Sequence, residues 1–284
     1  MNDKKVYLNG KIVPAGDAKI SIFDQGFLHG ASTFTTMLAH NGVVVGFDYH
    51  LRRLSETINL LGLRVEATSR ELIDATYDVI DANKLKDARV RITLTPGSAS
   101  DEESTVIVTA DQLPDYPASM YEQGIKVVIS SFKQALGDPI FGYKTGCYLT
   151  RILARKEAAA KGAEDAIWFT TDNRLAEGCF SNIFLVRDGV VYTPPRDTPV
   201  LPGFVRHCVI DLCDQLGIEC ESTKTLTIHD LLGAEEVFFT GSCVGICPIR
   251  QIENHAVADE NPGEITLKLM IEYKKFLTRT CKTR

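Results

Sequence analysis

The sequence predicts two mixed α/β domains joined by a short linker, and three observations carry this prediction. The chain has 284 residues, enough for two domains of ordinary size. Short alternating strand patterns are interleaved with amphipathic helix patterns in both halves. Between the halves, Asp111–Pro117 contains two prolines and no hydrophobic periodicity. We therefore expect a small α+β domain at 1–112, a linker at 113–120 and a larger α/β domain at 121–284.

The first domain is predicted to open with β-hairpins. Asn9-Gly10 and Asn41-Gly42 each stand between apolar runs, and Asn-Gly is a strong signal for a two-residue hairpin turn. The expected strands are 6–8, 11–13, 34–38, 43–47, 89–95 and 105–109. Asp48 resembles the N-cap of a helix whose apolar stripe ends before Gly62, and a second helix is expected at 69–83.

The second domain alternates between the two kinds of element in the same way. Its expected strands are 125–130, 166–170, 183–186, 190–192 and 236–239. Its expected helices are 148–161, 204–216 and 263–279. Such interleaving is typical of a mixed α/β domain.

Composition excludes several classes of function. The net charge is −6 and Lys and Arg are scattered, so nothing indicates a nucleic-acid-binding surface. The N-terminus lacks the apolar region of a signal peptide, and no window is long and apolar enough for a membrane span. We expect a cytoplasmic protein whose eight cysteines are free thiols. Cys243 and Cys247 lack further ligands at metal-binding spacing, so we expect no metal site.

Lys144 lies between two glycines, Gly142 and Gly146, just ahead of the helix expected at 148–161. The helix dipole disfavours a lysine near an N-terminus, so this lysine is either solvated in a loop or held there for chemistry. Desolvation or a neighbouring positive charge, such as the positive end of that helix, lowers the pKa of a lysine. Such a lysine suits Schiff-base chemistry with a carbonyl.

Three further blocks of residues suggest a binding site. Glu177 begins Glu-Gly-Cys-Phe-Ser-Asn-Ile-Phe, which places an acid in a close turn before an apolar strand. Leu201-Pro202-Gly203 precedes a predicted helix, where backbone N–H groups can bind phosphate. Thr240-Gly241-Ser242 ends a predicted strand and offers N–H and hydroxyl donors. Each block taken alone could be an ordinary turn.

Together, in this order and spacing, the blocks resemble the fold-type IV pyridoxal-5′-phosphate enzymes. These are the branched-chain aminotransferases, the D-amino-acid aminotransferases and the aminodeoxychorismate lyases. The resemblance runs nearly end to end and includes Asp24–Gly30 and Phe47–Leu54. It implies a two-domain fold like that of D-amino-acid aminotransferase, bound pyridoxal 5′-phosphate and a homodimer.

The resemblance also implies roles for single residues. Lys144 would form the internal aldimine and move the Cα proton, and Glu177 would pair with the pyridine nitrogen and keep the ring an electron sink. Arg53 matches the arginine that binds the cofactor phosphate, for which its planar fork is suited. Tyr148 matches a tyrosine near the cofactor.

The remaining phosphate ligands implied by the resemblance are backbone amides and one hydroxyl. They are the amides of Phe204 and Val205 and the amide and hydroxyl of Ser242. Val205 stands where the family usually has threonine, so only its amide can serve. Substrate contacts are expected at Phe27, Thr35, Arg91 and Cys243.

The sequence leaves the reaction open. Most aminotransferases of the family have an acidic residue at Thr35, and Phe34-Thr35-Thr36 is more similar to the lyases. Arg91, by contrast, matches an arginine near the substrate carboxylate in branched-chain aminotransferases, although it could equally pair with Glu102 or Glu103. Thr95-Pro96-Gly97 lacks the arginine of the D-specific enzymes.

We favour an aminotransferase that moves an amino group between a branched-chain-like α-amino acid and a 2-oxo acid. The alternative is a 4-amino-4-deoxychorismate lyase that releases 4-aminobenzoate and pyruvate. A third possibility is a cofactor-binding protein without turnover, against which the intact Lys144 and Glu177 argue.

Overall fold

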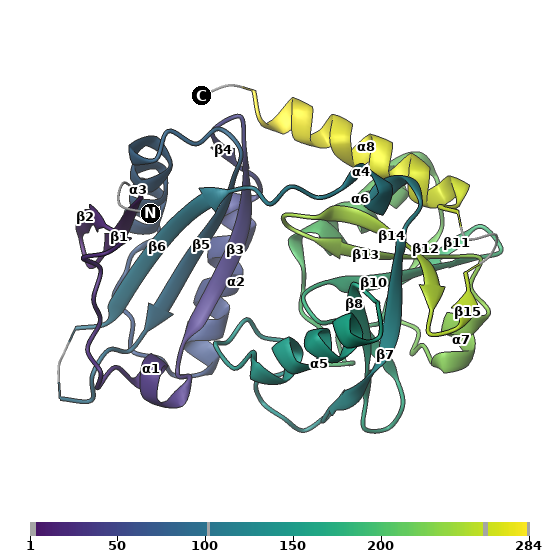
Figure 1. Cartoon of the computed structure of the whole chain (residues 1–284), viewed down its shortest axis with the longest axis horizontal. Helices are drawn as coiled ribbons and strands as arrows, with labels where there is room; N and C mark the ends of the chain where they lie inside the picture. The colour runs from purple at the N-terminus through teal and green to yellow at the C-terminus, as the bar shows by residue number, and fades with distance from the viewer. Residues whose placement is uncertain (1–3, 101–102, 258–260, 283–284) are drawn as a thin grey trace. The chain divides into compact units, whose positions relative to one another are not determined.

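The computed structural model describes residues 4–100, 103–257 and 261–282 (Figure 1). The chain divides into two compact units. Unit 1 comprises the N-terminal residues to Pro114, Lys144–Cys147 and the C-terminal residues from Leu277. Unit 2 comprises Asp115–Tyr143 and Tyr148–Phe276. From the sequence, Lys144–Cys147 and the C-terminus were expected in the second domain. The division into a small domain at 1–112, a linker at 113–120 and a larger domain at 121–284 stays a prediction.

Within the described residues, unit 1 holds a six-stranded antiparallel sheet in the order β2-β1-β6-β5-β3-β4. The strands are β1 (Lys5–Leu8), β2 (Lys11–Pro14), β3 (Thr33–His40), β4 (Val43–Val44), β5 (Ala88–Thr95) and β6 (Thr105–Gln112). Both Asn-Gly hairpin turns are confirmed. Asn9 and Gly10 have φ of 45° and 85°, and Asn41 and Gly42 have φ of 51° and 77°. Two successive positive φ angles are what the twist-compatible hairpin turn requires.

Helices α2 (Phe47–Leu60) and α3 (Ser69–Ala82) pack on this sheet and share its core. Leu54 and Val79 from the helices meet Met37, Val90 and Ile92 from the strands. The short helix α1 (Gln25–His29) precedes β3. Thr68 begins α3 with a reciprocal capping box to Glu71.

Several predicted boundaries in unit 1 are wrong. The strand expected at 43–47 ends at Val44, because Gly46 adopts a left-handed conformation with φ of 64°. Gly46, and not Asp48, is the N-cap of α2. Strand β6 continues to Gln112, since Asp111 pairs with Arg89 across the sheet. Part of the expected linker is also helical, as α4 (Ala118–Glu122).

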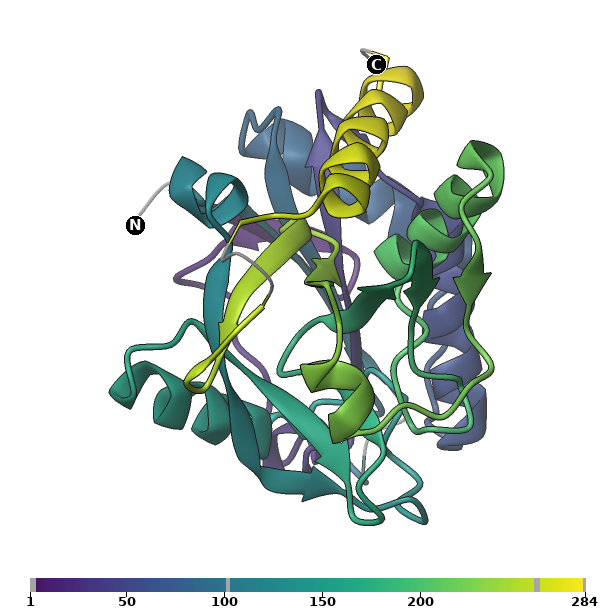
Figure 2. The same ribbon diagram turned by 90° about the vertical axis from the view of Figure 1, so that its right-hand side faces the viewer.

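The described part of unit 2 holds a nine-stranded sheet, most of which closes on itself. The ring runs β10-β13-β14-β7-β8-β9 and returns to β10 through the pair Asn182–Glu177 (Figures 1 and 2). The members of the ring are β7 (Ile125–Gln134), β8 (Asp165–Thr170), β9 (Leu175–Gly178), β10 (Asn182–Arg187), β13 (Glu236–Gly241) and β14 (Gly245–Ile252). Strands β11 (Val190–Tyr192), β12 (Cys220–Glu221) and β15 (His255–Ala256) extend it. A closed sheet leaves fewer unpaired edges.

Alternate side chains of the ring enter two different cores. Val127, Ile167 and Ile183 belong to one apolar cluster with Phe239 and Ile249. Their neighbours Val128, Ala166 and Trp168 belong to a second cluster that includes Ala154 and Ala158 of helix α5 (Leu149–Ala160). Successive side chains of a strand point to opposite faces of a sheet. One set therefore faces the inside of the ring, and the other set faces helix α5.

Other helices cover the rest of unit 2. Helix α6 (Phe204–Leu216) packs against β13. Helix α8 (Glu264–Thr280) contacts it through Phe276, whose ring centroid lies 6.5 Å from that of Phe204. The five-residue helix α7 is Ile228–Leu232. Among the described helices, none is both long enough and apolar enough to cross a lipid bilayer.

Candidate active site

Lys144 is held by the first residues of β3. Its carbonyl accepts hydrogen bonds from the Phe34 amide at 2.9 Å and from the Thr33 hydroxyl at 3.0 Å. Thr145 forms a β-bridge with Thr33. The loop that the sequence placed ahead of a helix is therefore bridged directly to the first residues of β3.

Gly146 makes this close pairing possible. A Cβ atom there would lie 2.1 Å from the Ser32 Oγ, and the Gly146 amide donates to the Ser32 carbonyl at 2.8 Å. A side chain there would force the Ser32 hydroxyl to move out of its present position. Helix α5 itself begins five residues after Lys144, at Leu149.

The ammonium group of Lys144 lies near an aromatic ring that it shares with Arg91. The Lys144 Nζ is 4.9 Å from the centroid of the Phe34 ring, and the Arg91 Cζ is 3.6 Å from the same centroid. Arg91 also donates through Nε to the Thr93 hydroxyl at 2.9 Å. The predicted substrate arginine and the predicted catalytic lysine therefore both contact the Phe34 ring. The alternative partner Glu102 lies outside the described residues.

Arg53 and Thr35, two further predicted site residues, meet at a buried histidine. The Arg53 Nη2 donates to the Thr35 Oγ1 at 3.2 Å, and the same oxygen lies 2.8 Å from the His50 Nδ1. All three residues are buried. Burial, followed by the positive charges of Arg53 and Lys144, lowers the pKa of His50 well below its ordinary value of 6.5. His50 is thus neutral at pH 7 and occupies a region of positive potential.

Phe27 and Cys243, the remaining predicted substrate contacts, lie in different units. Phe27 is exposed on α1, and the Asp24 carboxylate accepts from its amide at 3.2 Å. Asp24 also accepts from the Thr95 and Thr105 hydroxyls at 2.6 and 2.7 Å, which anchors this loop to β5 and β6. Cys243 is half-buried in the turn between β13 and β14. The described residues contain no cluster of possible metal ligands.

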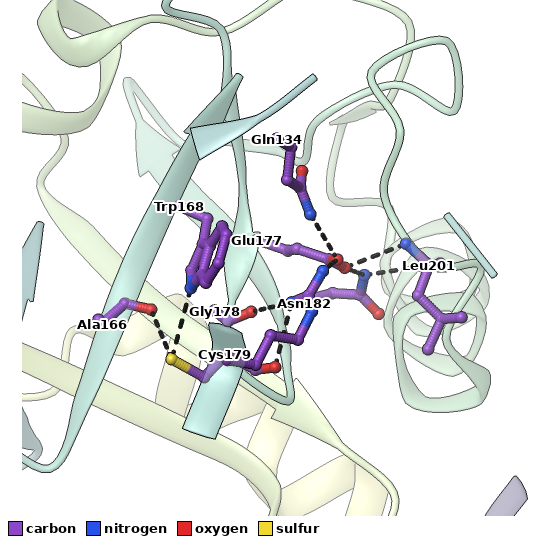
Figure 3. A network of polar contacts seen from close by, with 9 residues as sticks. Gln134, Ala166, Trp168, Glu177, Gly178, Cys179, Asn182 and Leu201 are labelled. Carbon is purple, nitrogen blue, oxygen red and sulfur yellow. Dashed lines mark hydrogen bonds and ion pairs between the residues drawn. The ribbon is translucent and has the colours of Figure 1, made fainter. Parts of the chain in front are cut away.

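Glu177 lies in a buried network of donors in unit 2 (Figure 3). Its Oε1 accepts from the Arg151 Nη2 at 2.6 Å and from the Gln134 Nε2 at 3.1 Å. Its Oε2 accepts from the Leu201 amide at 3.0 Å and from the Asn182 Nδ2 at 3.4 Å. Each of these partners donates, so the network accommodates an ionised carboxylate.

The two oxygens of Glu177 differ in how much more they can accept. A carboxylate oxygen offers about two lone-pair positions. Oε1 has two donors, one of them charged, whereas the 3.4 Å contact to Oε2 is long. The Asn182 Nδ2 makes a better bond to the Leu201 carbonyl, at 2.8 Å. Oε2 is therefore the oxygen that can accept a stronger donor from a bound molecule.

A β-bulge places Glu177. The three residues of β8 from Ile167 to Phe169 oppose the four residues of β9 from Gly178 back to Leu175. Bulges redirect side chains and occur beside active sites. Leu175 packs inside the ring, while Glu177 reaches Arg151 on α5.

Asn182 connects Glu177 with the predicted phosphate-binding segments. It pairs with Glu177 on one side and with Thr240 on the other, so the three side chains lie in one row across the sheet. The Thr240 Oγ1 is buried and has no hydrogen-bond partner among the residues described here. Such an atom, next to Gly241 and Ser242, would be satisfied by a ligand oxygen.

The start of α6 also fits an anion. Its N-cap is Gly203, and no side chain caps the helix. A Cβ at Gly203 would lie 2.1 Å from the Asn182 Oδ1, so only glycine allows this approach. The amides of Phe204 and Val205 open the helix, where the dipole and N–H groups favour phosphate. These residues therefore fit a molecule with a phosphate and a protonated ring nitrogen.

Several residues of these networks were missed by the sequence analysis. They are Thr33, His50, Gln134, Arg151 and the Leu201 amide as a donor. Arg151 had a detectable signal, because it shares the buried stripe of α5 with Ala154 and Ala158. Tyr148, by contrast, was predicted, and it stacks on Phe180 with a centroid distance of 5.6 Å at the start of α5.

The fold and these two clusters define an enzyme of the aminotransferase kind, and comparison with known proteins agrees. Residues 32–252 match the family profile described as Amino-transferase class IV. The chain belongs to this family, whose members are pyridoxal-phosphate-dependent enzymes with the fold-type IV architecture.

The similar proteins are named for more than one activity. The chain is 30% identical over 278 residues to the branched-chain-amino-acid aminotransferase of Escherichia coli K12, covering 93% of this chain and 90% of the relative. It is 29% identical over 279 residues to the aminodeoxychorismate lyase of Bacillus subtilis, covering 95% and 94%. The crystal structure of the Escherichia coli branched-chain amino acid aminotransferase superposes with a TM-score of 0.91, at 28% identity, and covers 96% of this chain and 94% of that one.

Proposed function

We propose that this chain is a pyridoxal-5′-phosphate-dependent aminotransferase that transfers the amino group of a branched-chain-like α-amino acid to a 2-oxo acid. The observation that carries the proposal is the buried Glu177 carboxylate, which is bonded only by donors and keeps capacity on Oε2. A protonated ring nitrogen is the donor that such an oxygen suits. The family and the named branched-chain relative support the choice of reaction.

Bound pyridoxal phosphate supplies an electron sink for the electrons left when a Cα proton departs. In the proposal Lys144 would attach the cofactor; once the substrate amine has displaced it, its Nζ would take the proton lost from Cα and deliver it to C4′ of the cofactor. Glu177 Oε2 would accept a hydrogen bond from the ring nitrogen. Tyr148 would contribute to the cofactor-binding surface.

Phosphate binding is assigned to residues of α2, α6 and the turn after β13. The Arg53 guanidinium supplies charge, while the amides of Phe204 and Val205 and the amide and hydroxyl of Ser242 supply neutral donors. Phe27, Thr35, Arg91 and Cys243 are assigned to the substrate. Arg91 and the Lys144 ammonium both contact the Phe34 ring, which supports the assignment of Arg91 to a substrate carboxylate.

A homodimer is the second part of the proposal. Unit 1 exposes Ile22, Phe23 and Phe27 at 67%, 63% and 65%, and unit 2 exposes Leu149 at 68%. Large apolar side chains gathered in one segment, here 20–28, indicate a protein partner. A second copy of the chain is the partner that the family resemblance implies. Sedimentation at micromolar concentration should give twice the chain mass, and a monomer would contradict it. Residence in the cytoplasm stays a prediction.

Half-reactions test the transferase directly. The purified enzyme with pyridoxal phosphate is mixed with valine, leucine, isoleucine or alanine, each as the L and the D form, and the visible absorption band is followed. We expect a branched-chain amino acid to convert the band fastest, with the matching 2-oxo acid as product. No conversion by any amino donor would reject the transferase.

The lyase is kept as a second candidate because of Thr35. A neutral hydroxyl bonded to His50 and Arg53 stands where an acidic side chain is usual in the family's transferases. The lyase of Bacillus subtilis is also among the relatives. Release of pyruvate and 4-aminobenzoate from aminodeoxychorismate, faster than any half-reaction, would establish this candidate instead.

A further inference from the structure

Arg151 occupies an unusual place on helix α5. The other buried residues of that helix are Ala154 and Ala158, which share its stripe. Small side chains let the helix approach the sheet closely, and arginine is rarely buried without a specific partner. A buried arginine on this face of the helix therefore indicates a specific binding partner.

The guanidinium of Arg151 binds three consecutive residues. Its Nη1 donates to the carbonyls of Gly178 and Cys179 at 3.0 and 3.1 Å, and its Nη2 donates to the Glu177 Oε1 at 2.6 Å. The carbonyls belong to the bulged end of β9 and the turn that follows. One side chain thus fixes both the backbone that carries Glu177 and one oxygen of its carboxylate.

Aromatic rings enclose the guanidinium. The Arg151 Cζ lies 5.2 Å from the Trp168 ring centroid and 5.7 Å from that of Tyr148. Burial alone would lower the pKa of Arg151, but the Glu177 carboxylate and the hydrogen bond to it raise the pKa above its ordinary value. The charge on Arg151 is therefore permanent, and rings shield the ion pair from water.

We propose that Arg151 is a positioning residue for the reaction: it binds Glu177 Oε1, fixes the backbone that carries Glu177 and presents Oε2 to the cofactor ring. This inference rests on the proposed function and assigns a role that Glu177 alone would not fulfil. Without the guanidinium, Oε1 keeps the Gln134 donor, and the carbonyls of Gly178 and Cys179 lose the Arg151 donor. Oε2 would then no longer be held toward the ring nitrogen, and the ring would lose the partner that stabilises its charge.

Lysine cannot replace this arginine fully. The carbonyls and the carboxylate are bound by two different nitrogens, Nη1 and Nη2, held in one plane. An ammonium has a single nitrogen and a shorter reach. Arg151→Lys keeps the positive charge but cannot bind the carbonyls and the carboxylate at the same time. This variant therefore separates the contribution of the charge from that of the hydrogen bonds.

The first test compares holoenzyme variants. Arg151→Met should lower kcat by about 100-fold, as expected for a misplaced catalytic group, while KM changes little. Arg151→Lys should recover part of this loss. The visible band of Arg151→Met should also change its pH dependence and its position, because the ring nitrogen loses its proton. Arg155→Met is the matched control, since Arg155 lies one turn further along α5 and is exposed.

A double-mutant cycle with Glu177→Gln separates positioning from a purely structural role. If Arg151 acts through Glu177, Arg151→Met should cost little further rate once Glu177→Gln is present. Equal losses of kcat in both backgrounds would overturn the inference. So would a spectrum and kcat of Arg151→Met identical to those of wild type.

Folding is monitored at the same place. Trp168 is the single tryptophan of the chain and stacks beside Arg151, so its emission reports on the network. If Arg151→Met fails to fold by circular dichroism, Arg151→Lys carries the same cycle. A wild-type enzyme that shows no band with pyridoxal phosphate would reject the proposed function itself. If wild type shows a normal band and the Arg151 variants have the same band and kcat as wild type, only the role proposed for Arg151 is rejected.

Discussion

The Lys144 cluster of unit 1 and the Glu177 network of unit 2 have opposite electrostatic character. In unit 1, burial and then the positive charges of Arg53 and Lys144 lower the pKa of His50, which contacts Arg53 and the Thr35 hydroxyl. In unit 2, a buried carboxylate raises the pKa of Arg151. One region disfavours additional positive charge, and the other holds a negative charge in place.

Under the proposed function, the two regions would meet two different demands of pyridoxal phosphate. A lysine that acts as a nucleophile must lose its proton, and a positive surrounding favours that loss. A ring nitrogen that withdraws electrons must keep its proton, and a fixed carboxylate favours that. We therefore expect that removing Lys144 from unit 1 abolishes attachment of the cofactor. Removing the charge of Glu177 from unit 2 should instead slow proton removal while the cofactor stays bound.

Lys144→Ala should have the largest effect. The variant loses the amine that attaches the cofactor, so both the visible band and all activity should disappear after dialysis. Lys133→Ala serves as control, because Lys133 is an exposed lysine bonded to Asn173. Retention of band and activity by Lys144→Ala would refute the role of unit 1.

Glu177→Gln should come next. The amide keeps the shape of the side chain but not its charge, so we expect bound cofactor and proton removal slowed by about 10²- to 10⁴-fold. Single-turnover kinetics with an amino acid measure this rate. Glu157→Gln, an exposed change on α5, should leave it unaltered. A wild-type rate for Glu177→Gln would count against the ring-nitrogen assignment.

Gly203→Ala should have a smaller effect, on cofactor affinity and stability together. The new Cβ would lie 2.1 Å from the Asn182 Oδ1, in the row that links Glu177 to the start of α6. We expect a loss of about 1–3 kcal/mol in the free energy of unfolding, as for overpacking. Gly137→Ala is the control, since a Cβ there meets nothing within 4 Å. Urea unfolding measures the stability of each variant, and titration with pyridoxal phosphate measures its cofactor affinity. The same stability and affinity in Gly203→Ala and Gly137→Ala would contradict the predicted clash with Asn182.

The smallest predicted effect is a pH dependence from His50. Its pKa in the folded chain lies below 6.5, so on acidification the unfolded chain takes up a proton first. The free energy of unfolding should therefore fall below pH 6.5, by up to about 1.4 kcal/mol per pH unit, until the folded pKa is reached. Unfolding at pH 7.5, 6.5 and 5.5 measures this slope. His50→Gln should abolish the contribution, whereas the exposed His255→Gln should keep it.

The sequence predicted most elements of the fold because their local signals agree with the tertiary structure. Both Asn-Gly turns and the helix at Phe204–Leu216 lie where the patterns indicate. Strand β14 was missed, since Pro248 within it lacks an amide donor and is unusual in a strand between two neighbours. Alternation alone does not reveal such a strand.

The candidate site was predicted only where a short motif marks a residue. Glu177 and Lys144 stand in such motifs, but the pairing of Lys144 with Thr33 spans 111 positions and leaves no local pattern. The bulge that turns Glu177 toward Arg151 depends on how β8 and β9 align. Such long-range registers arise from packing of the whole sheet, so residues that act through them are found only in the structure.

Trapping the cofactor tests the central claim most directly. Purified enzyme with pyridoxal phosphate is reduced with borohydride, digested and analysed by mass spectrometry to locate the modified lysine. The account predicts the cofactor mass on the peptide that contains Lys144. Modification of a different lysine, or of none, would contradict it.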